Sequence, residues 1–199
     1  MKVECNFPAA VMMAANRVKE AGGRCLLVGG GVLAALDGKD PKDWDIEVYG
    51  LSYNKLQNIF STEAPKLVGN QFGVIKLNID GLELDISLPR RENKVGLGHK
   101  GFDIELVPDM DEEEAGRRRD FTINSMGINI HTKELSDWFG GLEDYRKGIL
   151  RATDPETFVE DPLRVLRGMQ LLARKAKYID LKTMQLMNSM AHTFPELAK

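Results

Sequence analysis

The sequence contains three aspartates whose spacing suits metal-dependent chemistry. Asp43 and Asp45 are separated by one residue, and the polar–apolar alternation over Asp43–Tyr49 predicts a strand that presents both carboxylates on one face. Asp85 lies on a second predicted strand, on the side that does not face the core. Carboxylates that converge from neighbouring strands can bind two Mg²⁺ ions, one activating an attacking hydroxyl and the other holding a triphosphate. These aspartates are therefore candidate metal ligands and catalytic residues for phosphoryl transfer.

Each of these acidic residues also has an ordinary interpretation. An Asp-x-Asp pair is common on solvated surfaces. Asp85 faces Lys76 across a predicted hairpin, where an ion pair would contribute only about 0.2–1 kcal/mol. The Asp-x-Asp pair, Asp85 and a nearby glycine turn together indicate phosphoryl transfer more specifically than any one of them alone.

Three consecutive glycines, Gly29, Gly30 and Gly31, follow a predicted buried strand at Arg24–Val28 and precede a predicted short helix. Glycine lets backbone amides approach phosphate oxygens, and the start of a helix favours anions, so the turn is a candidate phosphate cradle. A tight strand-to-helix turn without a ligand is the alternative. A dinucleotide fingerprint is disfavoured because the next strands form a hairpin rather than a parallel crossover.

A predicted β-hairpin positions Asp85. Val74–Ile79 and Leu82–Ser87 alternate with period two around Asp80-Gly81, a dipeptide that favours a two-residue type I′ turn. This turn sets the register. The expected apolar pairs are Ile75 with Ile86, Leu77 with Leu84 and Ile79 with Leu82, and the expected polar pairs are Lys76 with Asp85 and Asn78 with Glu83.

The remaining elements follow from periodicity and from Gly and Pro. Asp161-Pro162 has the composition of a helix start. Residues 90–101 are polar and glycine-rich, which predicts a loop. The expected helices span residues 8–21, 32–36, 163–172 and 180–190.

Composition excludes several classes of protein. With 199 residues, 43% hydrophobic and 29% charged, the chain has enough apolar residues for a core, which excludes disorder. A net charge of -3 excludes a uniformly basic surface, so any RNA contact must be local. The longest apolar stretch, Cys25–Leu36, is too short for a membrane span, and the N-terminus lacks a secretory signal. Two isolated cysteines predict reduced thiols and a cytoplasmic protein.

Six short motifs occur between about residues 24 and 175. They are Val28-Gly29-Gly30, Lys42-Asp43-Trp44-Asp45, Leu67-Val68-Gly69-Asn70-Gln71-Phe72-Gly73-Val74, Arg118-Arg119-Asp120-Phe121-Thr122-Ile123-Asn124, Phe139-Gly140-Gly141-Leu142-Glu143-Asp144 and Glu160-Asp161-Pro162-Leu163-Arg164-Val165-Leu166-Arg167. In composition and order they resemble the motifs of class II tRNA nucleotidyltransferases (CCA-adding enzymes) and bacterial poly(A) polymerases.

The resemblance implies an α+β fold. It places a polymerase-β-like nucleotidyltransferase head, with a mixed sheet flanked by helices, at residues 1–150 and an all-helical neck at residues 151–199. It implies that Asp43 and Asp45 bind the catalytic Mg²⁺. It further implies that Arg119 and Asp120 recognise the ribose, and that Asp161 and Arg164 hydrogen-bond the base edge of CTP or ATP. The remaining expected nucleotide-binding residues are Gly29, Gly30, Asn124 and Arg167.

Several of these residues have structural alternatives. Asn124 could hold the Arg-Asp turn through its amide or satisfy backbone groups. Asp161 could simply cap a helix, and Arg167 could reach phosphate or belong to a solvated basic face. Glu113 and Glu114 could pair with Arg117 and Arg118 at i,i+4.

The chain departs from the family pattern in two respects. Leu33 and Ala34 stand where the family has Arg-Asp, so a phosphate contact is lost. The family's body and tail helices, which grip tRNA, follow the neck, so the resemblance implies that this chain is truncated before that C-terminal region.

The expected function is metal-dependent transfer of CMP and AMP from CTP and ATP to the tRNA 3′ end, with release of pyrophosphate. The alternatives are poly(A) addition to other RNA 3′ ends, a catalytically weak RNA-binding or regulatory homologue, and a nucleotidyltransferase for small molecules.

Overall fold

The computed structural model describes residues 1–63, 65–68, 73–96 and 102–198, apart from the side chains at 66–68, 102 and 196–198. Contacts divide the chain into two compact units. Unit 1 comprises Met1–Arg91, Ile104–Glu112 and Gly127–Ser136, and unit 2 comprises Glu92–Asp103, Glu113–Met126 and Asp137–Lys199. A boundary between a head and a neck at residue 150 stays a prediction, because contact-based units and catalytic domains need not coincide.

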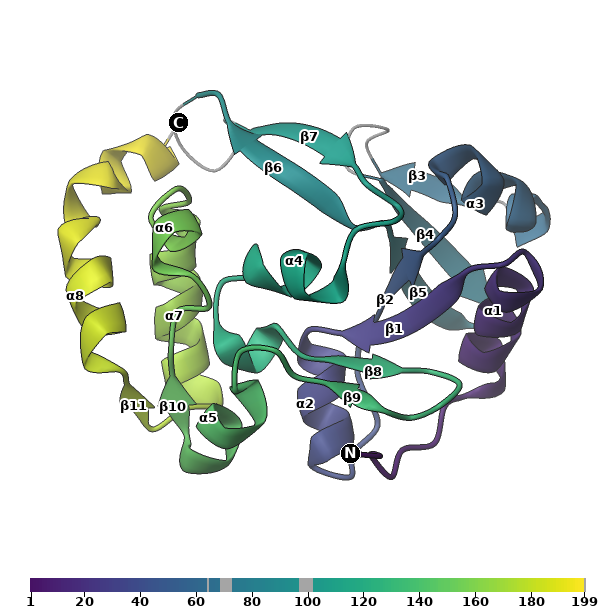
Figure 1. Cartoon of the computed structure of the whole chain (residues 1–199), viewed down its shortest axis with the longest axis horizontal. Coiled ribbons are helices and arrows are strands. Elements are labelled where there is room, and N and C mark those ends of the chain that lie inside the picture. Colours follow the sequence, from purple (N-terminus) through teal and green to yellow (C-terminus); the bar gives the residue numbers. More distant parts are fainter. Residues whose placement is uncertain (64, 69–72, 97–101, 199) are drawn as a thin grey trace. The chain divides into compact units, whose positions relative to one another are not determined.

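Unit 1 is built on a mixed sheet in the order β3-β4-β5-β2-β1-β8-β9 (Figure 1). The β2–β5 pair is parallel and the other pairs are antiparallel. The strands are β1 (Arg24–Val28), β2 (Trp44–Tyr49), β3 (Lys66–Val68), β4 (Val74–Ile79), β5 (Leu82–Ser87), β8 (Gly127–Asn129) and β9 (Leu135–Ser136). The helices are α1 (Ala9–Glu20), α2 (Gly30–Leu36) and α3 (Tyr53–Ile59), followed by the 3-10 turn η1 (Ser61–Glu63).

The predicted hairpin is confirmed pair by pair. β4 and β5 pair Ile75 with Ile86, Leu77 with Leu84 and Lys76 with Asp85. Asp80 and Gly81 have φ of 52° and 86°, the two positive values that a type I′ turn requires. The turn chemistry therefore decides which side chains face the core.

Close packing of α2 on β1 fixes the position of the glycine turn. A Cβ at Gly31 would lie 2.7 Å from Cδ1 of Leu27, so a larger residue would push the helix off the strand. Leu27 pairs with Ile46 in the sheet, and both side chains are buried. The turn that precedes α2 is thereby held against the core strands.

Unit 2 is mostly helical and has its own apolar core. Phe121 and Phe158 are fully buried and meet edge to face at 5.3 Å. A Cβ at Gly168 would lie 2.9 Å from the Phe121 ring, so glycine lets α7 approach it. The helices are α5 (Gly141–Lys147), α6 (Pro155–Phe158), α7 (Leu163–Arg174) and α8 (Leu181–Ser189), and the 3-10 segments are η2 (Thr122–Asn124) and η3 (Ala191–Ala198).

The expectation of an all-helical region from residue 151 onward is wrong in one detail. Tyr178–Ile179 forms β11, which pairs in parallel with β10 (Ile149–Leu150). Because this bridge is only two residues long, it left no periodic signal in the sequence.

The predicted loop at residues 90–101 is also wrong in part. Arg90–Lys94 forms β6, which pairs with β7 (Phe102–Leu106) as a two-stranded sheet. Arg91 and Glu105 form an ion pair at 3.9 Å across it. Residues 97–101 lie outside the described part of the chain. Strand formation here depends on pairing with β7, which the charged composition of β6 does not reveal.

The remaining helix, α4 (Glu112–Arg117), contains residues of both units. Glu113 and Arg117 form one of the expected i,i+4 ion pairs, at 3.0 Å. Over the described residues, no helix combines the length and apolar character that a membrane crossing requires.

Candidate active site

Two aspartates and a lysine of unit 1 lie in a row across three strands. β2 and β5 pair Asp45 directly with Asp85, and β5 and β4 pair Asp85 with Lys76. Residues that are directly opposite in a sheet project from the same face. We call Asp45, Asp85 and Lys76 the acidic row. Asp43 is exposed and lies just before β2. The strand begins at Trp44, one residue later than predicted from the sequence.

The Asp85 carboxylate has a partner in the row. Nζ of Lys76 lies 2.5 Å from Oδ2 of Asp85, and the side chains are 47% and 36% exposed. This hydrogen bond raises the pKa of Lys76 above its ordinary value, and the charges of Glu83 and Asp45 act in the same direction. The ion pair with Lys76, which the sequence offered as an ordinary role for Asp85, is therefore present.

Glu47 shares the face of Asp45 but points into a covered part of it. Glu47 and Tyr49 are both buried, and Oη of Tyr49 donates to Oε2 of Glu47 at 2.8 Å. The alternation predicted for this strand is confirmed. In the second half of the strand, Glu47 and Tyr49 are buried and hydrogen-bond to each other, so they do not line an exposed site.

The acidic residues suit a hard cation but do not form a closed cage. Within the described residues, no group of three or more Asp, Glu, His or Cys side chains is placed to hold a metal ion. Mg²⁺ usually keeps several waters and binds through one or two carboxylates together with substrate phosphates. Asp43 and Asp45, partly or fully exposed before and at the start of β2, match this requirement.

The glycine turn lies beside this carboxylate. Gly29 has φ 64° and ψ -138°, a conformation that glycine adopts without strain, and it precedes α2. A Cβ at Gly29 would lie 3.5 Å from Oδ2 of Asp45, whereas one at Gly30 would meet nothing within 4 Å. The backbone of the turn is thus next to Asp45 and open at Gly30.

Leu33 is the residue expected from the sequence to stand in place of a family arginine. Its side chain is only 1% exposed. The Leu33 side chain therefore packs in the core.

In unit 2, Asp120 organises the turn that contains Arg119 and Asn124. Asp120 is 6% exposed. Its Oδ1 accepts hydrogen bonds from the Phe121 backbone N–H at 2.8 Å and from Nδ2 of Asn124 at 3.0 Å. Nε of Arg167 donates to Oδ2 at 2.7 Å. Asn124 therefore holds the turn through its amide, one of the two roles left open by the sequence, and Arg167 is tied to Asp120.

The start of α7 carries a polar pair with a free donor. Asp161 accepts the Leu163 N–H at 2.9 Å, as a helix-start residue does. Arg164 is 8% exposed and donates Nη2 to the Arg118 carbonyl at 2.7 Å. Its buried Nη1 has no hydrogen-bond partner among the residues that the structure describes. Buried donors are rarely left unpaired, so this nitrogen is available to an acceptor from outside the described residues.

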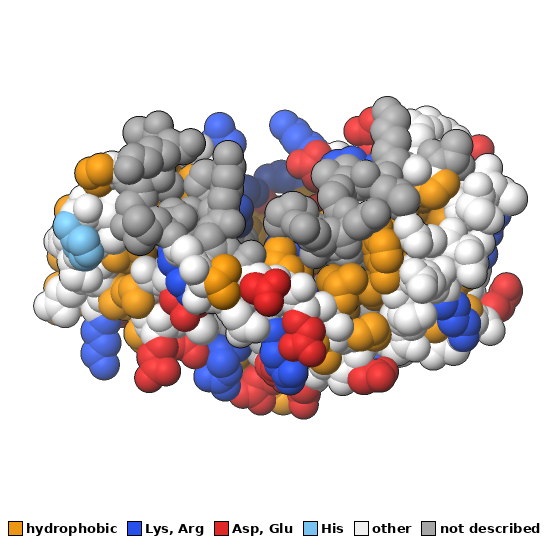
Figure 2. All heavy atoms as spheres, turned by 90° about the horizontal axis from the view of Figure 1, so that it is seen from above, with side chains coloured by type: hydrophobic (Ala, Val, Ile, Leu, Met, Phe, Trp, Pro, Cys, Tyr) orange, Lys and Arg blue, Asp and Glu red, His pale blue; other side chains and the backbone are white. Residues whose placement is uncertain are grey.

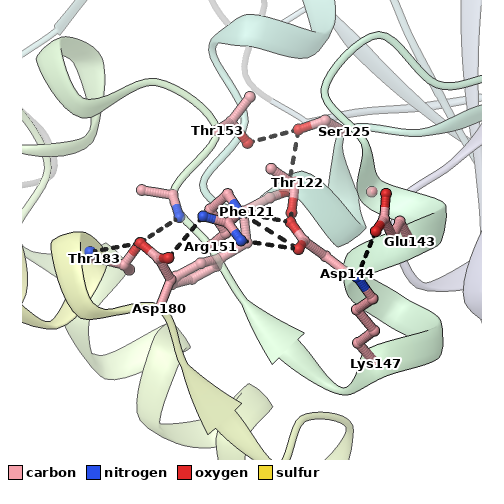
Figure 3. Close-up of polar contacts among 12 residues, drawn as sticks. Phe121, Thr122, Ser125, Glu143, Asp144, Lys147, Arg151, Thr153, Asp180 and Thr183 are labelled. Atoms are coloured by element: carbon pink, nitrogen blue, oxygen red, sulfur yellow. Dashed lines mark hydrogen bonds and ion pairs between the residues drawn. The ribbon is translucent and has the colours of Figure 1, made fainter.

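A network that the sequence did not predict supports the Asp120 turn (Figure 3). Arg151 lies between two acidic residues, donating Nε to Asp144 at 3.0 Å and Nη1 to Asp180 at 2.7 Å. Asp144 also accepts Oγ1–H of Thr122 at 2.8 Å. The hydrogen bond to Asp144 is the main cause that raises the pKa of Arg151.

The backbone of Arg151 continues this support. Its carbonyl accepts the Thr122 N–H at 2.9 Å, and the Thr153 N–H donates to the Asp120 carbonyl at 3.1 Å. The Asp120–Thr122 segment is thus held by main chain on one side and by Asp144 on the other. Asp144 ends one of the six motifs, which was the only sequence signal for this network.

Charges on the surface are mixed. On the face shown in Figure 2, Lys and Arg side chains are interspersed with Asp and Glu side chains. This agrees with the expectation that any contact with RNA is local.

Comparison with known proteins places these residues in context. Residues 25–151 match the family model described as the poly A polymerase head domain. The Multifunctional CCA protein of Xanthomonas campestris pv. campestris (strain B100) is 38% identical over 168 residues, which cover 83% of this chain and 39% of that protein. The chain thus spans about two fifths of the length of the curated relatives that it matches.

Solved structures show the same architecture. An apo form of a CCA-adding enzyme has a TM-score of 0.75 and 28% identity, with 94% of this chain and 45% of that chain covered. A tRNA nucleotidyltransferase complexed with a primer tRNA and an incoming ATP analog has a TM-score of 0.71 and 29% identity, with 90% and 50% covered.

Proposed function

Because the chain belongs to the poly A polymerase head-domain family, we propose that it transfers CMP and AMP from CTP and ATP to the 3′ end of tRNA, releasing pyrophosphate. Relatives named as CCA proteins and the solved complex with a primer tRNA and an ATP analog support this substrate class. Since tRNA is the acceptor, the proposal also places the protein in the cytoplasm. Within the chain, the observation that carries the proposal is the open glycine turn beside Asp45.

Asp43 and Asp45 would hold Mg²⁺ through their carboxylate oxygens, with Asp85 as a third carboxylate on the same face as Asp45. When bound, Mg²⁺ lowers the pKa of the RNA 3′-hydroxyl and stabilises negative charge on the α-phosphate and the leaving pyrophosphate. The backbone at Gly29 and Gly30 accommodates the triphosphate, because no side chain blocks its approach at Gly30.

The unit 2 residues would select and orient the nucleotide. Arg164 offers the unpaired Nη1 to an acceptor on the base, and Asp161 offers carboxylate oxygens to a base amino group. Arg119 and Asp120 would bind the ribose. Asn124 and Arg167 contribute by fixing Asp120, whose two oxygens they contact.

Two alternatives have specific support. Poly(A) addition is favoured by the family model itself, which describes a poly A polymerase head. A catalytically weak RNA-binding homologue is favoured by the buried Leu33, which supplies no charge to phosphate.

One assay separates these functions. RNA that ends just before CCA is incubated with the chain, CTP, ATP and Mg²⁺, and the added nucleotides are sequenced. Addition of C, C and A supports the proposal, and a long A tract supports the poly(A) alternative. Binding of tRNA without incorporation at saturating nucleotide supports the weak homologue. Saturating RNA is used because the curated relatives are longer than this chain.

A further inference from the structure

Two carboxylates of the acidic row would repel one another if nothing compensated their charge. Asp45 and Asp85 are direct partners on neighbouring parallel strands and project from the same face. Adjacent strands are about 4.8 Å apart, and like charges directly opposite one another in a sheet are destabilising. A nearby cation would therefore stabilise this pair.

The chain supplies a cation of its own. Lys76 is the β4 partner of Asp85, and its ammonium contacts Oδ2 at 2.5 Å. The row thus runs Lys76, Asp85, Asp45 across three adjacent strands. The charge of Asp45 also acts on Lys76, although Asp45 lies one strand further away.

The contact with Lys76 can be exchanged. Both side chains are substantially exposed, at 47% for Lys76 and 36% for Asp85. A lysine ammonium is a strongly hydrated charge on a flexible stem, so it can leave a carboxylate at small cost. A divalent cation that approaches Asp85 meets an oxygen already used by the ammonium.

We propose that Lys76 is the built-in counter-ion of the acidic row: it holds Asp85 while no divalent cation is bound, and its charge weakens divalent-cation binding at Asp45 and Asp85. This inference rests on the proposed function only in taking the row as the cation site. Lys76 is thus a positioning residue that tunes cation affinity.

The test is a titration of the unaltered chain and variants with Mn²⁺, without nucleotide or RNA, with free Mn²⁺ measured by electron paramagnetic resonance. Lys76→Met is expected to bind Mn²⁺ about threefold to fivefold more tightly, the range typical of one exposed charge pair. Lys76→Arg keeps the charge and is expected to bind like the unaltered chain. Adding Asp85→Asn to Lys76→Met should remove the gain.

The control and a second readout keep the inference falsifiable. Lys147→Met removes a lysine that pairs with Glu143 on exposed α5 of unit 2, so its Mn²⁺ affinity should not change. Without metal, Lys76→Met should melt at a lower temperature than the unaltered chain, and Mn²⁺ should close the difference.

Equal or weaker Mn²⁺ binding by Lys76→Met, or no binding by either protein, would overturn the inference. If Lys76→Met binds more tightly but the unaltered chain incorporates no nucleotide, the inference stands and the proposed function fails.

Discussion

Arg167 of α7 donates Nε to Oδ2 of Asp120 at 2.7 Å, so one buried carboxylate joins α7 to the turn that ends at Asn124. Since Asp120 is buried, its polar oxygens need hydrogen-bond partners inside unit 2, and these residues supply them. The turn and the start of α7, which carry the proposed ribose and base contacts, are thereby one connected element.

Removal of this arginine should therefore destabilise the protein. We expect Arg167→Ala to lower the free energy of unfolding by about 1–2 kcal/mol, because it removes a charged hydrogen bond between a half-exposed arginine and a buried carboxylate. Urea denaturation followed by circular dichroism measures the change. Arg174→Ala, at the exposed end of α7, is the matched control and should change stability by less than about 0.5 kcal/mol. Equal effects of the two substitutions would contradict the account.

The unpaired nitrogen of Arg164 makes a prediction about base choice. Arg164→Ala should reduce discrimination among CTP, ATP and UTP by about tenfold, since a well-placed arginine contact to a base is worth about 1–3 kcal/mol. Competition assays with mixed nucleotides give the selectivity. Total incorporation should fall less than selectivity. If base choice is unchanged while the rate falls, Arg164 supports the fold and does not read the base.

Both the shape and the charge of the Arg151 side chain should contribute to stability. Its planar guanidinium contacts Asp144 and Asp180 at once, which a lysine ammonium cannot reproduce. We expect Arg151→Lys to lower unfolding free energy by about 1 kcal/mol and Arg151→Met by about 2–3 kcal/mol, because Asp144 is left buried without its main cation. Chemical denaturation of the two variants measures this difference. Equal losses would show that Arg151 contributes packing alone.

The two cysteines should differ in reactivity. Burial raises the pKa of the Cys25 thiol from about 9 to about 12, while Cys5 is only partly buried. At pH 8 iodoacetamide should label Cys5 well before Cys25, since the thiolate is the nucleophile. Mass spectrometry of timed samples reports the order, and faster labelling of Cys25 would be inconsistent with its position in β1.

The same burial predicts an alkaline loss of stability. The folded-state pKa of Cys25 is raised, so the unfolded chain loses its proton first as pH rises. The contribution of Cys25 is fully present below pH 9 and is lost between pH 9 and 12. In Cys25→Ala the loss of stability over this interval should be smaller. An unchanged pH profile would exclude Cys25 as its cause.

Local signals made the β4–β5 hairpin predictable. The Asp80-Gly81 turn and strict alternation together leave a single register, and the structure has it. The Lys76–Asp85 pair followed directly from that register. The sequence could not show that β5 pairs in parallel with β2, because those strands are far apart in the chain, and this pairing is what brings Asp85 next to Asp45.

The features that sequence reasoning missed depend on distant partners. β6 is a charged segment that becomes a strand only by pairing with β7. Arg151 joins Asp144 to Asp180, which lies 29 residues away. The roles of Asn124 and Arg167 stayed open for the same reason, because both are decided by where the Asp120 carboxylate lies. Leu33 packs in the core, and the loss of a phosphate contact at this position stays a prediction.

The central claim is that the corner formed by Gly29 and Asp45 catalyses nucleotidyl transfer. The most direct measurement is the single-turnover rate of CMP addition from CTP, with Mg²⁺, to tRNA that ends just before CCA. We predict addition by the unaltered chain and a loss of about a thousandfold in Asp45→Asn, because metal-ion stabilisation of the transition state is worth several kcal/mol. Circular dichroism should show the same fold for both. No addition by the unaltered chain at saturating CTP and tRNA, or an equal rate in Asp45→Asn, would contradict the claim.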